Sequence, residues 1–300
     1  MYMESILDAI GNTPMISLRK TTGLPVFAKA EYLNPGGSIK DRVACFMIEQ
    51  AESRGVLKPG MTIVEPTSGN TGIGIALAGV QKGYRVIIVM PENMSEERKK
   101  IIQALGAELL LTRAEDSING SVQAVLRIKA EHPDVFIPQQ FENPDNPRVH
   151  YQTTAPEIWE QLAGDIDVFV SGLGSGGTLE GIGRFFKERR TDIRVVAVEP
   201  KNVSALLGHE PGLHKIQGIG DGFIPAVLDV RLIDEVIEVS DNDAVDMARI
   251  LARTQGVLVG TSSGANVWAA MRAAEQYGHG KKIVTILPDR VERYFSTSLI

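Results

Sequence analysis

The sequence contains a single cysteine, few aromatic residues and no long apolar run. Cys45 is the only cysteine among 300 residues, which rules out an internal disulfide and a cysteine-based metal site. We expect Cys45 to be a small buried thiol on a helix. No apolar segment approaches membrane-spanning length, and the amino-terminal segment lacks the basic region and apolar core of a signal peptide. We therefore expect a cytoplasmic globular protein without membrane contact.

An excess of basic residues is also missing. The chain has 31 Lys and Arg against 37 Asp and Glu, which gives a formal net charge of -6. This balance argues against general binding to nucleic acids or membrane surfaces. The histidines are scattered without the spacing of metal ligands, so we predict no metal site. The length suits one large or two medium domains with a substantial core.

Strand and helix signals alternate along the chain. Helical patterns separate short segments that are continuously apolar, as in strands of sheets covered on both faces. Repeated βα units indicate a mostly parallel α/β fold, with ligands at the carboxyl ends of the strands. The predicted strands are Val26–Ala30, Thr62–Val64, Arg85–Met90, Glu108–Leu111, Phe136–Ile137, Val168–Ser171, Arg194–Val198, Glu235–Val239 and Lys282–Leu287. The predicted helices include Thr71–Lys82, Ser95–Leu105, Gly120–Glu131, Thr178–Arg189, Asp241–Thr254 and Ala265–Tyr277, and a loop is predicted at Gln139–Arg148.

A lysine lies where a glycine pair leads into a predicted helix. The segment Asn34–Arg42 reads Asn-Pro-Gly-Gly-Ser-Ile-Lys-Asp-Arg, and Ser38 with Asp41 matches a capping box. Lys40 then lies at the positive end of the helix, whose field lowers the pKa of its amine. Such a lysine suits a Schiff-base nucleophile. On this segment alone, a surface lysine whose ammonium reaches water explains the pattern equally well.

The segment Thr67–Gly72 follows a predicted strand and reads Thr-Ser-Gly-Asn-Thr-Gly. Backbone N–H groups and hydroxyls at a helix N-terminus form a neutral, donor-rich site for a carboxylate. The amide of Asn70 adds a further donor or acceptor. Residues of this kind are also common helix caps. Because so many in succession exceed what capping requires, we favour a ligand-binding loop.

A second glycine-rich turn, Ser171–Thr178, follows another predicted strand. Its backbone N–H groups can hold a phosphate. The same residues match the dinucleotide fingerprint at Gly172–Gly177, and Glu199 ends the next strand where a ribose-binding acid would lie. Taken alone, this segment therefore also fits an NAD-dependent oxidoreductase. The combination with an amine and a carboxylate site favours pyridoxal-phosphate chemistry on an amino acid.

The chain resembles the cysteine synthases (O-acetylserine sulfhydrylases), fold-type-II pyridoxal-phosphate enzymes of the tryptophan synthase β family. The resemblance runs from Ile10 to Thr297, and its motifs occur in the family's order. It implies two open, twisted, mostly parallel sheets flanked by helices, with the cofactor between two domains. Residues 1–12 and 35–145 would form a smaller domain that closes over the substrate, and residues 13–34 and 146–300 a larger domain that holds the cofactor phosphate. The motifs are Asn34–Arg42, Pro66–Gly72, Gly174–Thr178, Lys215–Gly220 and Gly260–Gly264.

The resemblance also assigns roles to single residues. Lys40 would bind pyridoxal 5′-phosphate as a Schiff base and later carry the proton at Cα. Asn70 would contact the 3′-oxygen of the cofactor, and Ser262 its pyridine nitrogen. The 5′-phosphate loop would consist of Gly174, Ser175, Gly176, Gly177 and Thr178. The substrate carboxylate would bind Thr67, Ser68, Thr71 and Gln140.

The implied reaction forms L-cysteine from O-acetyl-L-serine and sulfide through an aminoacrylate intermediate. A neutral serine at the pyridine nitrogen makes the ring a weaker electron sink than a carboxylate would, which favours loss of a β-leaving group. The resemblance further implies a homodimer, with serine acetyltransferase as a candidate partner.

Asp221 departs from the pattern of the family, because many cysteine synthases have alanine there. An acid near the cofactor can activate water or receive the amino group of a second amino acid. Asp221 therefore leaves two alternative activities possible for the chain. One is a cysteine desulfhydrase, and the other is a cystathionine β-synthase-like β-replacement that releases hydrogen sulfide from cysteine. A side chain that turns outward and caps the loop would remove this argument.

Overall fold

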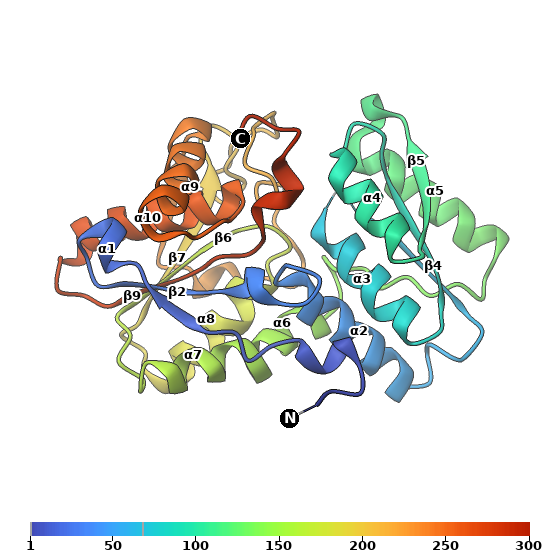
Figure 1. Cartoon of the computed structure of the whole chain (residues 1–300), viewed down its shortest axis with the longest axis horizontal. Coiled ribbons are helices and arrows are strands. Elements are labelled where there is room, and N and C mark those ends of the chain that lie inside the picture. The colour runs from blue at the N-terminus through green and yellow to red at the C-terminus, as the bar shows by residue number, and fades with distance from the viewer. Residues whose placement is uncertain (1, 68) are drawn as a thin grey trace.

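The computed structural model describes residues 2–67 and 69–300, whose strands form two sheets in separate lobes (Figure 1). The larger sheet has the order β1 (Met15–Ser17), β2 (Val26–Lys29), β9 (Ile283–Ile286), β6 (Val168–Gly172), β7 (Arg194–Pro200) and β8 (Glu235–Val239). The smaller sheet has the order β3 (Thr62–Pro66), β4 (Arg85–Pro91) and β5 (Glu108–Thr112). All neighbouring strands are parallel except β1 and β2. The predicted fold class is confirmed.

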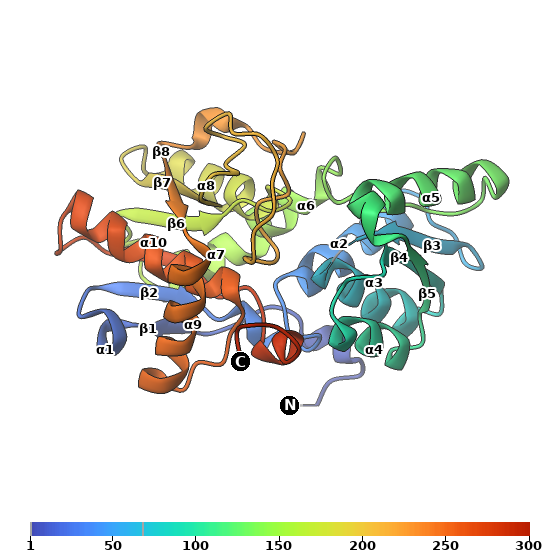
Figure 2. The same ribbon diagram turned by 90° about the horizontal axis from the view of Figure 1, so that it is seen from above.

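Helices cover both faces of each sheet (Figure 2). On the larger sheet, α9 (Asp241–Gln255) and α10 (Thr261–Tyr277) pack on one face, and α7 (Ala155–Gln161) and α8 (Gly177–Arg189) on the other. On the smaller sheet, α2 (Lys40–Ser53), α3 (Asn70–Gln81) and α4 (Glu96–Ala104) lie opposite α5 (Ser117–Glu131). The short helix α1 (Arg19–Thr22) lies beside α9, and α6 (Asp145–Val149) leads through a π-helical turn (His150–Thr154) into α7.

The central strand β6 shows why helices must pack on both faces of the sheet. Successive side chains of a strand point to opposite faces. Val168 and Val170 accordingly join the core under α9 and α10, while Phe169 joins the core under α7 and α8. All three are buried, so the strand reads as a continuous apolar run. Over the described residues, no helix is long and apolar enough to cross a membrane.

The predicted elements agree with the structure in position, with three exceptions. The predicted strand Phe136–Ile137 is wrong, because Phe136 forms only an isolated bridge to Ile63. The strand β1 was not predicted, since its three residues carry no clear alternation. The predicted loop Gln139–Arg148 contains the start of α6, where Asn146 is completely buried.

The predicted capping box at the start of α2 is also wrong. Ser38 Oγ accepts a hydrogen bond from Lys40 N at 3.2 Å rather than from Asp41 N, which donates to the backbone oxygen of Ser38. Instead, the Asp41 carboxylate accepts from Gly36 N at 2.6 Å. A Cβ added at Gly36 would lie 2.6 Å from Asp41 Oδ1, so the glycine is needed for this contact. The helix therefore begins at Lys40 without a side-chain cap.

A buried ionic network fixes the first turn of α2 to the larger lobe. The Arg42 guanidinium donates to Glu31 Oε2 and to Glu157 Oε1, both at 2.7 Å, and Lys29 Nζ lies 2.7 Å from Glu157 Oε2. Burial alone would raise the pKa of Glu31, but Arg42 and neighbouring hydrogen-bond donors lower that pKa to about 2. Because Lys40 lies two residues before Arg42, the network also determines where the lysine can reach.

We predict that Arg42→Met lowers the free energy of unfolding by about 3–5 kcal/mol at pH 7, because it leaves the buried Glu31 carboxylate without its cation. A lowered pKa means that Glu31 stabilises the native protein above about pH 4.5 and that this contribution is lost as the pH falls towards 2. The deficit of the variant should therefore shrink as the pH falls from about 4.5 towards 2, as measured by urea unfolding.

Arg85→Met is the matched control, since Arg85 makes a similar two-bond pair with Glu108 on the surface. This variant should leave the free energy of unfolding nearly unchanged. Equal losses for the two variants would contradict a special role of the buried network.

Candidate active site

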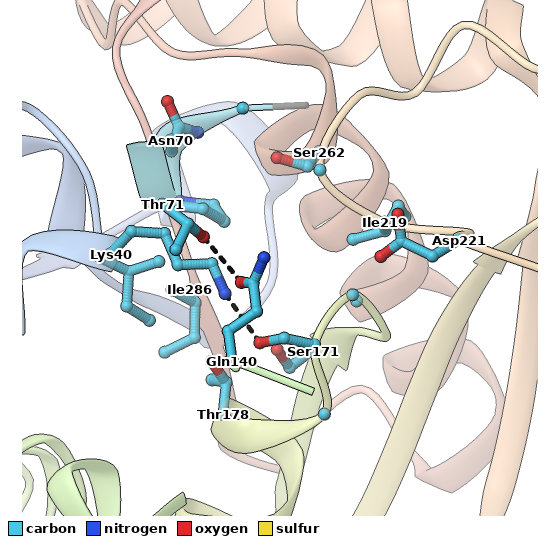
Figure 3. A pocket seen from close by; sticks show the side chains of 18 of the residues that line it. Lys40, Asn70, Thr71, Gln140, Ser171, Thr178, Ile219, Asp221, Ser262 and Ile286 are labelled. Carbon is cyan, nitrogen blue, oxygen red and sulfur yellow. Dashed lines mark hydrogen bonds between the residues drawn. The ribbon is translucent and has the colours of Figure 1, made fainter. Parts of the chain in front are cut away.

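A cavity lies between the lobes, where the carboxyl ends of β3, β6 and β9 meet the N-termini of α2, α3, α8 and α10 (Figure 3). Among the described residues, the N-caps of α3, α8 and α10 are glycines without a capping side chain, so these helices direct backbone N–H groups to the cavity. In α2 the first N–H groups are already paired, since Lys40 N donates to Ser38 Oγ and Asp41 N to Ser38 O. Of the lining residues that the structure describes, only Lys40 and Asp221 are charged. The predicted site residues that line the cavity are Lys40, Thr67, Asn70, Thr71, Gln140, Gly174, Ser175, Gly176, Thr178, Asp221 and Ser262.

Lys40 points across the cavity towards the glycine-rich loop. Its Nζ donates to Ser175 Oγ at 2.8 Å, as the dashed line in Figure 3 shows. Burial lowers the pKa of Lys40 to about 8, while the negative charge of Asp221 acts in the opposite direction. The predicted direction of the shift is confirmed, but burial rather than the helix field is its main cause. An amine of this pKa is partly neutral near physiological pH and can act as nucleophile or base.

The loop that receives Lys40 is built for an anion. Gly176 has φ +82 and forms the N-cap of α8 in a left-handed conformation. A Cβ at Gly174 would lie 2.4 Å from the carbonyl oxygen of Gly218, so only glycine allows the two loops to approach. The uncapped helix N-terminus then offers its N–H groups to a ligand such as phosphate. Gly177 belongs to the same turn, but its position is behind the cavity wall rather than on it.

The opposite wall carries the predicted carboxylate site. Thr71 Oγ1 donates to Gln140 Oε1 at 2.7 Å, and Thr67 Oγ1 accepts from Gly69 N at 3.1 Å. The hydroxyl of Thr71 and the amide of Gln140 face the same space as Lys40 (Figure 3). Ser68, predicted to join this site, lies outside the described residues.

Asn70 lies at the start of α3, and only the nitrogen of its side-chain amide has a hydrogen-bond partner among the described residues. Its Nδ2 donates to Asp289 Oδ2 at 2.7 Å, but its buried Oδ1 has no partner among the described residues. Asp289 also accepts from the Tyr294 hydroxyl at 2.8 Å, which fixes the carboxylate. Ser262 is buried in the first turn of α10 and lines the cavity. Both side chains therefore offer polar groups to a ligand in the cavity.

Asp221 lines the cavity on the loop that follows β7, and the residue as a whole is exposed. Partial loss of hydration between the cleft walls raises its pKa, while the Lys40 ammonium lowers it. The side chain therefore does not turn away to cap the loop. Its placement is compatible with the role in specificity that the sequence predicts.

The dinucleotide interpretation of Gly172–Gly177 requires Glu199 to face a ribose. Both carboxylate oxygens of Glu199 are occupied instead, by the Ser204 hydroxyl and by the backbone N–H groups of Ala205 and Leu206 at 3.1 Å. The side chain is buried under that turn. This geometry argues against a nucleotide site at the loop.

Three buried polar residues that support the site were not predicted. Asn266 accepts from Gly172 N at 2.8 Å and donates to Ile286 O at 2.9 Å, so it ties the ends of β6 and β9 together. Asp289 orients Asn70, and Asn146 contacts Ser175. A polar residue inside the apolar pattern of α10 was a signal for Asn266. The sequence offers no comparable signal for the other two.

Comparisons with known proteins agree with this geometry. Residues 6–289 match the family model described as pyridoxal-phosphate dependent enzyme. The chain is 48% identical to a cysteine synthase from Staphylococcus aureus, over 99% of this chain and 97% of that protein. The structure is similar to a cysteine synthase from Entamoeba histolytica, with a TM-score of 0.95 and 43% identity over 100% of this chain and 91% of the other. An O-acetylserine dependent cystathionine β-synthase from Helicobacter pylori gives a TM-score of 0.94 and 41% identity, over 100% of this chain and 99% of the other.

We predict that Lys40, in protein freed of bound ligands, reacts with formaldehyde under reducing conditions with a midpoint near pH 8, because only the neutral amine reacts. Ordinary exposed lysines titrate near 10.4. Asp221→Asn removes the negative charge that stabilises the ammonium, so the midpoint of Lys40 should move to lower pH. Peptide mass spectrometry of the methylated protein measures both midpoints. A midpoint that Asp221→Asn leaves unchanged would contradict the electrostatic influence of Asp221 on Lys40.

Proposed function

We propose, since the chain belongs to the family of pyridoxal-phosphate dependent enzymes, that it forms L-cysteine from O-acetyl-L-serine and sulfide. The observation that carries this proposal is the position of the Lys40 amine. It lies 2.8 Å from a hydroxyl of the anion-binding loop and faces the Thr71–Gln140 pair on the opposite wall. An amino acid held between these walls would present its Cα to the amine.

Different residues of the cavity suit the different functional groups of pyridoxal 5′-phosphate. The uncapped N-terminus of α8 and the Gly174–Thr178 loop suit its phosphate. The unpartnered Oδ1 of Asn70 and the second hydrogen of its amide suit a ring substituent. Ser262 offers a neutral hydroxyl for the pyridine nitrogen, and Lys40 an amine for the aldehyde carbon. When bound, pyridoxal phosphate supplies an electron sink for the Cα electron pair, a weaker one beside a hydroxyl than beside a carboxylate.

The substrate carboxylate is assigned to Thr67, Thr71 and Gln140, with Ser68 as a further candidate. The Thr71–Gln140 hydrogen bond occupies these groups in the absence of a ligand. A carboxylate would replace Gln140 as the acceptor of the Thr71 hydroxyl, and the Gln140 amide would turn to donate as well. Lys40 would then remove the proton at Cα and return it after the β-substituent has been exchanged. Its pKa of about 8 suits both directions of transfer.

The domain division and the assembly belong to the same proposal. We assign residues 1–12 and 35–145 to the smaller domain, which closes over the substrate, and residues 13–34 and 146–300 to the larger one. Closure would exclude water from the reacting Cβ. A homodimer is supported by the exposed Leu110, Leu111 and Leu126 of the smaller lobe. We place the enzyme in the cytoplasm and regard serine acetyltransferase as a candidate partner.

A second candidate function is favoured by Asp221. Its carboxylate lies on the cavity wall and influences Lys40, where it can accept a proton from water or from an incoming nucleophile. The enzyme would then also take cysteine as the β-donor and release hydrogen sulfide, as a desulfhydrase or in a cystathionine β-synthase-like replacement.

We predict that Lys40→Ala lowers cysteine formation from O-acetyl-L-serine and sulfide by at least about 10³-fold, since both the covalent contact and the proton carrier are lost. The visible absorbance of the purified enzyme should disappear at the same time. The exposed Lys20 provides the control variant Lys20→Ala, which should retain both. A purified protein that is colourless and takes up no pyridoxal phosphate would contradict the proposal.

For the second candidate, we predict that Asp221→Ala lowers sulfide release from cysteine at least about tenfold, because the proton acceptor is removed. Cysteine formation from O-acetyl-L-serine should change far less, since Lys40 carries that proton. Both rates are measured on the same preparation. Sulfide release that stays unchanged in the variant would remove Asp221 from the mechanism.

A further inference from the structure

Asn146 is a completely buried residue in the first turn of α6, and it connects the two walls of the cavity. Its Nδ2 donates to Gln140 O at 2.7 Å and to Ser175 Oγ at 3.0 Å. Gln140 belongs to the carboxylate wall and Ser175 to the glycine-rich loop. Both hydrogens of a single amide group are thus used to hold these two segments at a fixed separation.

The contact with Ser175 determines what that hydroxyl can do. Ser175 Oγ accepts from Lys40 Nζ at 2.8 Å as well as from Asn146. A hydroxyl has two acceptor positions and one hydrogen. Before Lys40 binds the cofactor, both acceptor positions are filled; once it has done so, Asn146 still occupies one of them, and the hydrogen of Ser175 is available for donation to an anion in the loop. Asn146 therefore orients the hydroxyl towards a phosphate.

The contact with Gln140 is made to its backbone carbonyl, so the side chain keeps its own hydrogen bond with Thr71. Gln140 N donates to Glu65 Oε1 at 3.3 Å, and the preceding Gln139 N donates to Glu65 Oε2 at 3.1 Å. Gln139 has φ +59, a left-handed conformation that a non-glycine residue adopts only when its surroundings impose it. Glu65 on the N–H groups and Asn146 on the carbonyl tie the Gln140 backbone to its surroundings, so Asn146 is the contact through which a change at Gln140 reaches the loop.

The position of Asn146 also explains the glycine at 177. A Cβ added at Gly177 would lie 2.0 Å from Asn146 Oδ1, so no larger residue fits beside the amide. Gly177 does not line the cavity, although its family motif places it in the phosphate loop. Its absent side chain makes room for Asn146 rather than for a ligand. The loop and Asn146 therefore form one packed unit.

We infer that Asn146 is a positioning residue that couples binding at the substrate-carboxylate wall to the geometry of the cofactor-phosphate loop. A carboxylate that displaces the Gln140 side chain from Thr71 shifts the Gln140 carbonyl to which Asn146 donates, and the Asn146 amide passes this shift to Ser175. The inference rests on the proposed function, because it uses the assignment of the two walls. It does not depend on which amino acid reacts.

The test is the phosphorus NMR resonance of pyridoxal phosphate in the holoenzyme, titrated with propionate. Propionate has the carboxylate but no amine, so it cannot react with the cofactor, and propionamide is the uncharged control ligand. In the wild type, propionate should change the chemical shift of the phosphorus resonance, and propionamide should not. We call this change the displacement. In Asn146→Asp, the new carboxylate cannot donate to Gln140 O and instead accepts the Ser175 hydrogen. The displacement should fall at least fourfold, while calorimetry still detects propionate binding, weakened about tenfold.

Asn143→Asp is the matched control, with the same change of group and charge in the same segment. Asn143 Nδ2 donates to Pro138 O at 2.8 Å, and its Oδ1 accepts from Asp145 N at 3.0 Å, a bond that an aspartate retains. Because its side chain bonds neither Gln140 nor Ser175, this variant should keep the wild-type displacement. Ser175→Ala breaks the bridge from its other end and should also abolish the displacement, which keeps the test decisive if Asn146→Asp fails to fold. A full displacement in either bridge variant, an equal loss in Asn143→Asp, or no displacement in the wild type would overturn the inference. Absence of cysteine formation alone would contradict the proposed function and leave this result standing.

Discussion

The structure depends on the convergence of helix N-termini on one cavity. Parallel strands deliver their carboxyl ends to the same edge of a sheet, and each following helix starts there. In this chain the two sheets turn these edges towards each other, so α2, α3 and α8 begin at the cavity, and α10, which follows α9, begins there as well. Within the described residues, α3, α8 and α10 begin at glycines that offer no capping side chain. The site is therefore rich in unpaired N–H groups with partial positive charge.

Such an arrangement needs rigid support, because uncapped helix ends and a charged lysine are unfavourable without ligands. The support consists of buried polar side chains behind the cavity wall. Arg42 and Glu31 fix the first turn of α2, Asn266 ties β6 to β9, and Asp289 holds Asn70. Each of these groups is buried and satisfies a neighbour from a distant part of the chain. The lobes are thus held by specific polar contacts as well as by apolar packing.

The sequence predicts the parts of the fold that repeat a local pattern. Strands such as Val168–Ser171 are mostly apolar because helices cover both faces of their sheet, and such a run can be recognised in the sequence alone. The glycine-rich turns were predicted for the same reason, since backbone approach demands glycine. The predicted capping box failed because Asp41 found a nearer donor in Gly36 N.

Residues whose role comes from distant contacts were not predictable. Asn146 lies in a segment with two prolines and two asparagines, a composition typical of a loop. Its neighbours Ser175 and Gln140 lie 29 and 6 residues away along the chain, and only the fold brings them together. Asp289 follows a proline after β9 and resembles an ordinary turn residue. Both positions become informative only when their buried partners are known.

The charge state of Lys40 links the support to the chemistry. Burial lowers the pKa of its amine to about 8, and Asp221 partly restores the charged form. The cavity offers anion sites on both sides of this amine, at the Gly174–Thr178 loop and at the Thr71–Gln140 pair. An anion that occupies either site favours the ammonium and raises the pKa of Lys40. The site is therefore most basic when it is filled, so that the lysine becomes a stronger proton acceptor only after the ligands are in place.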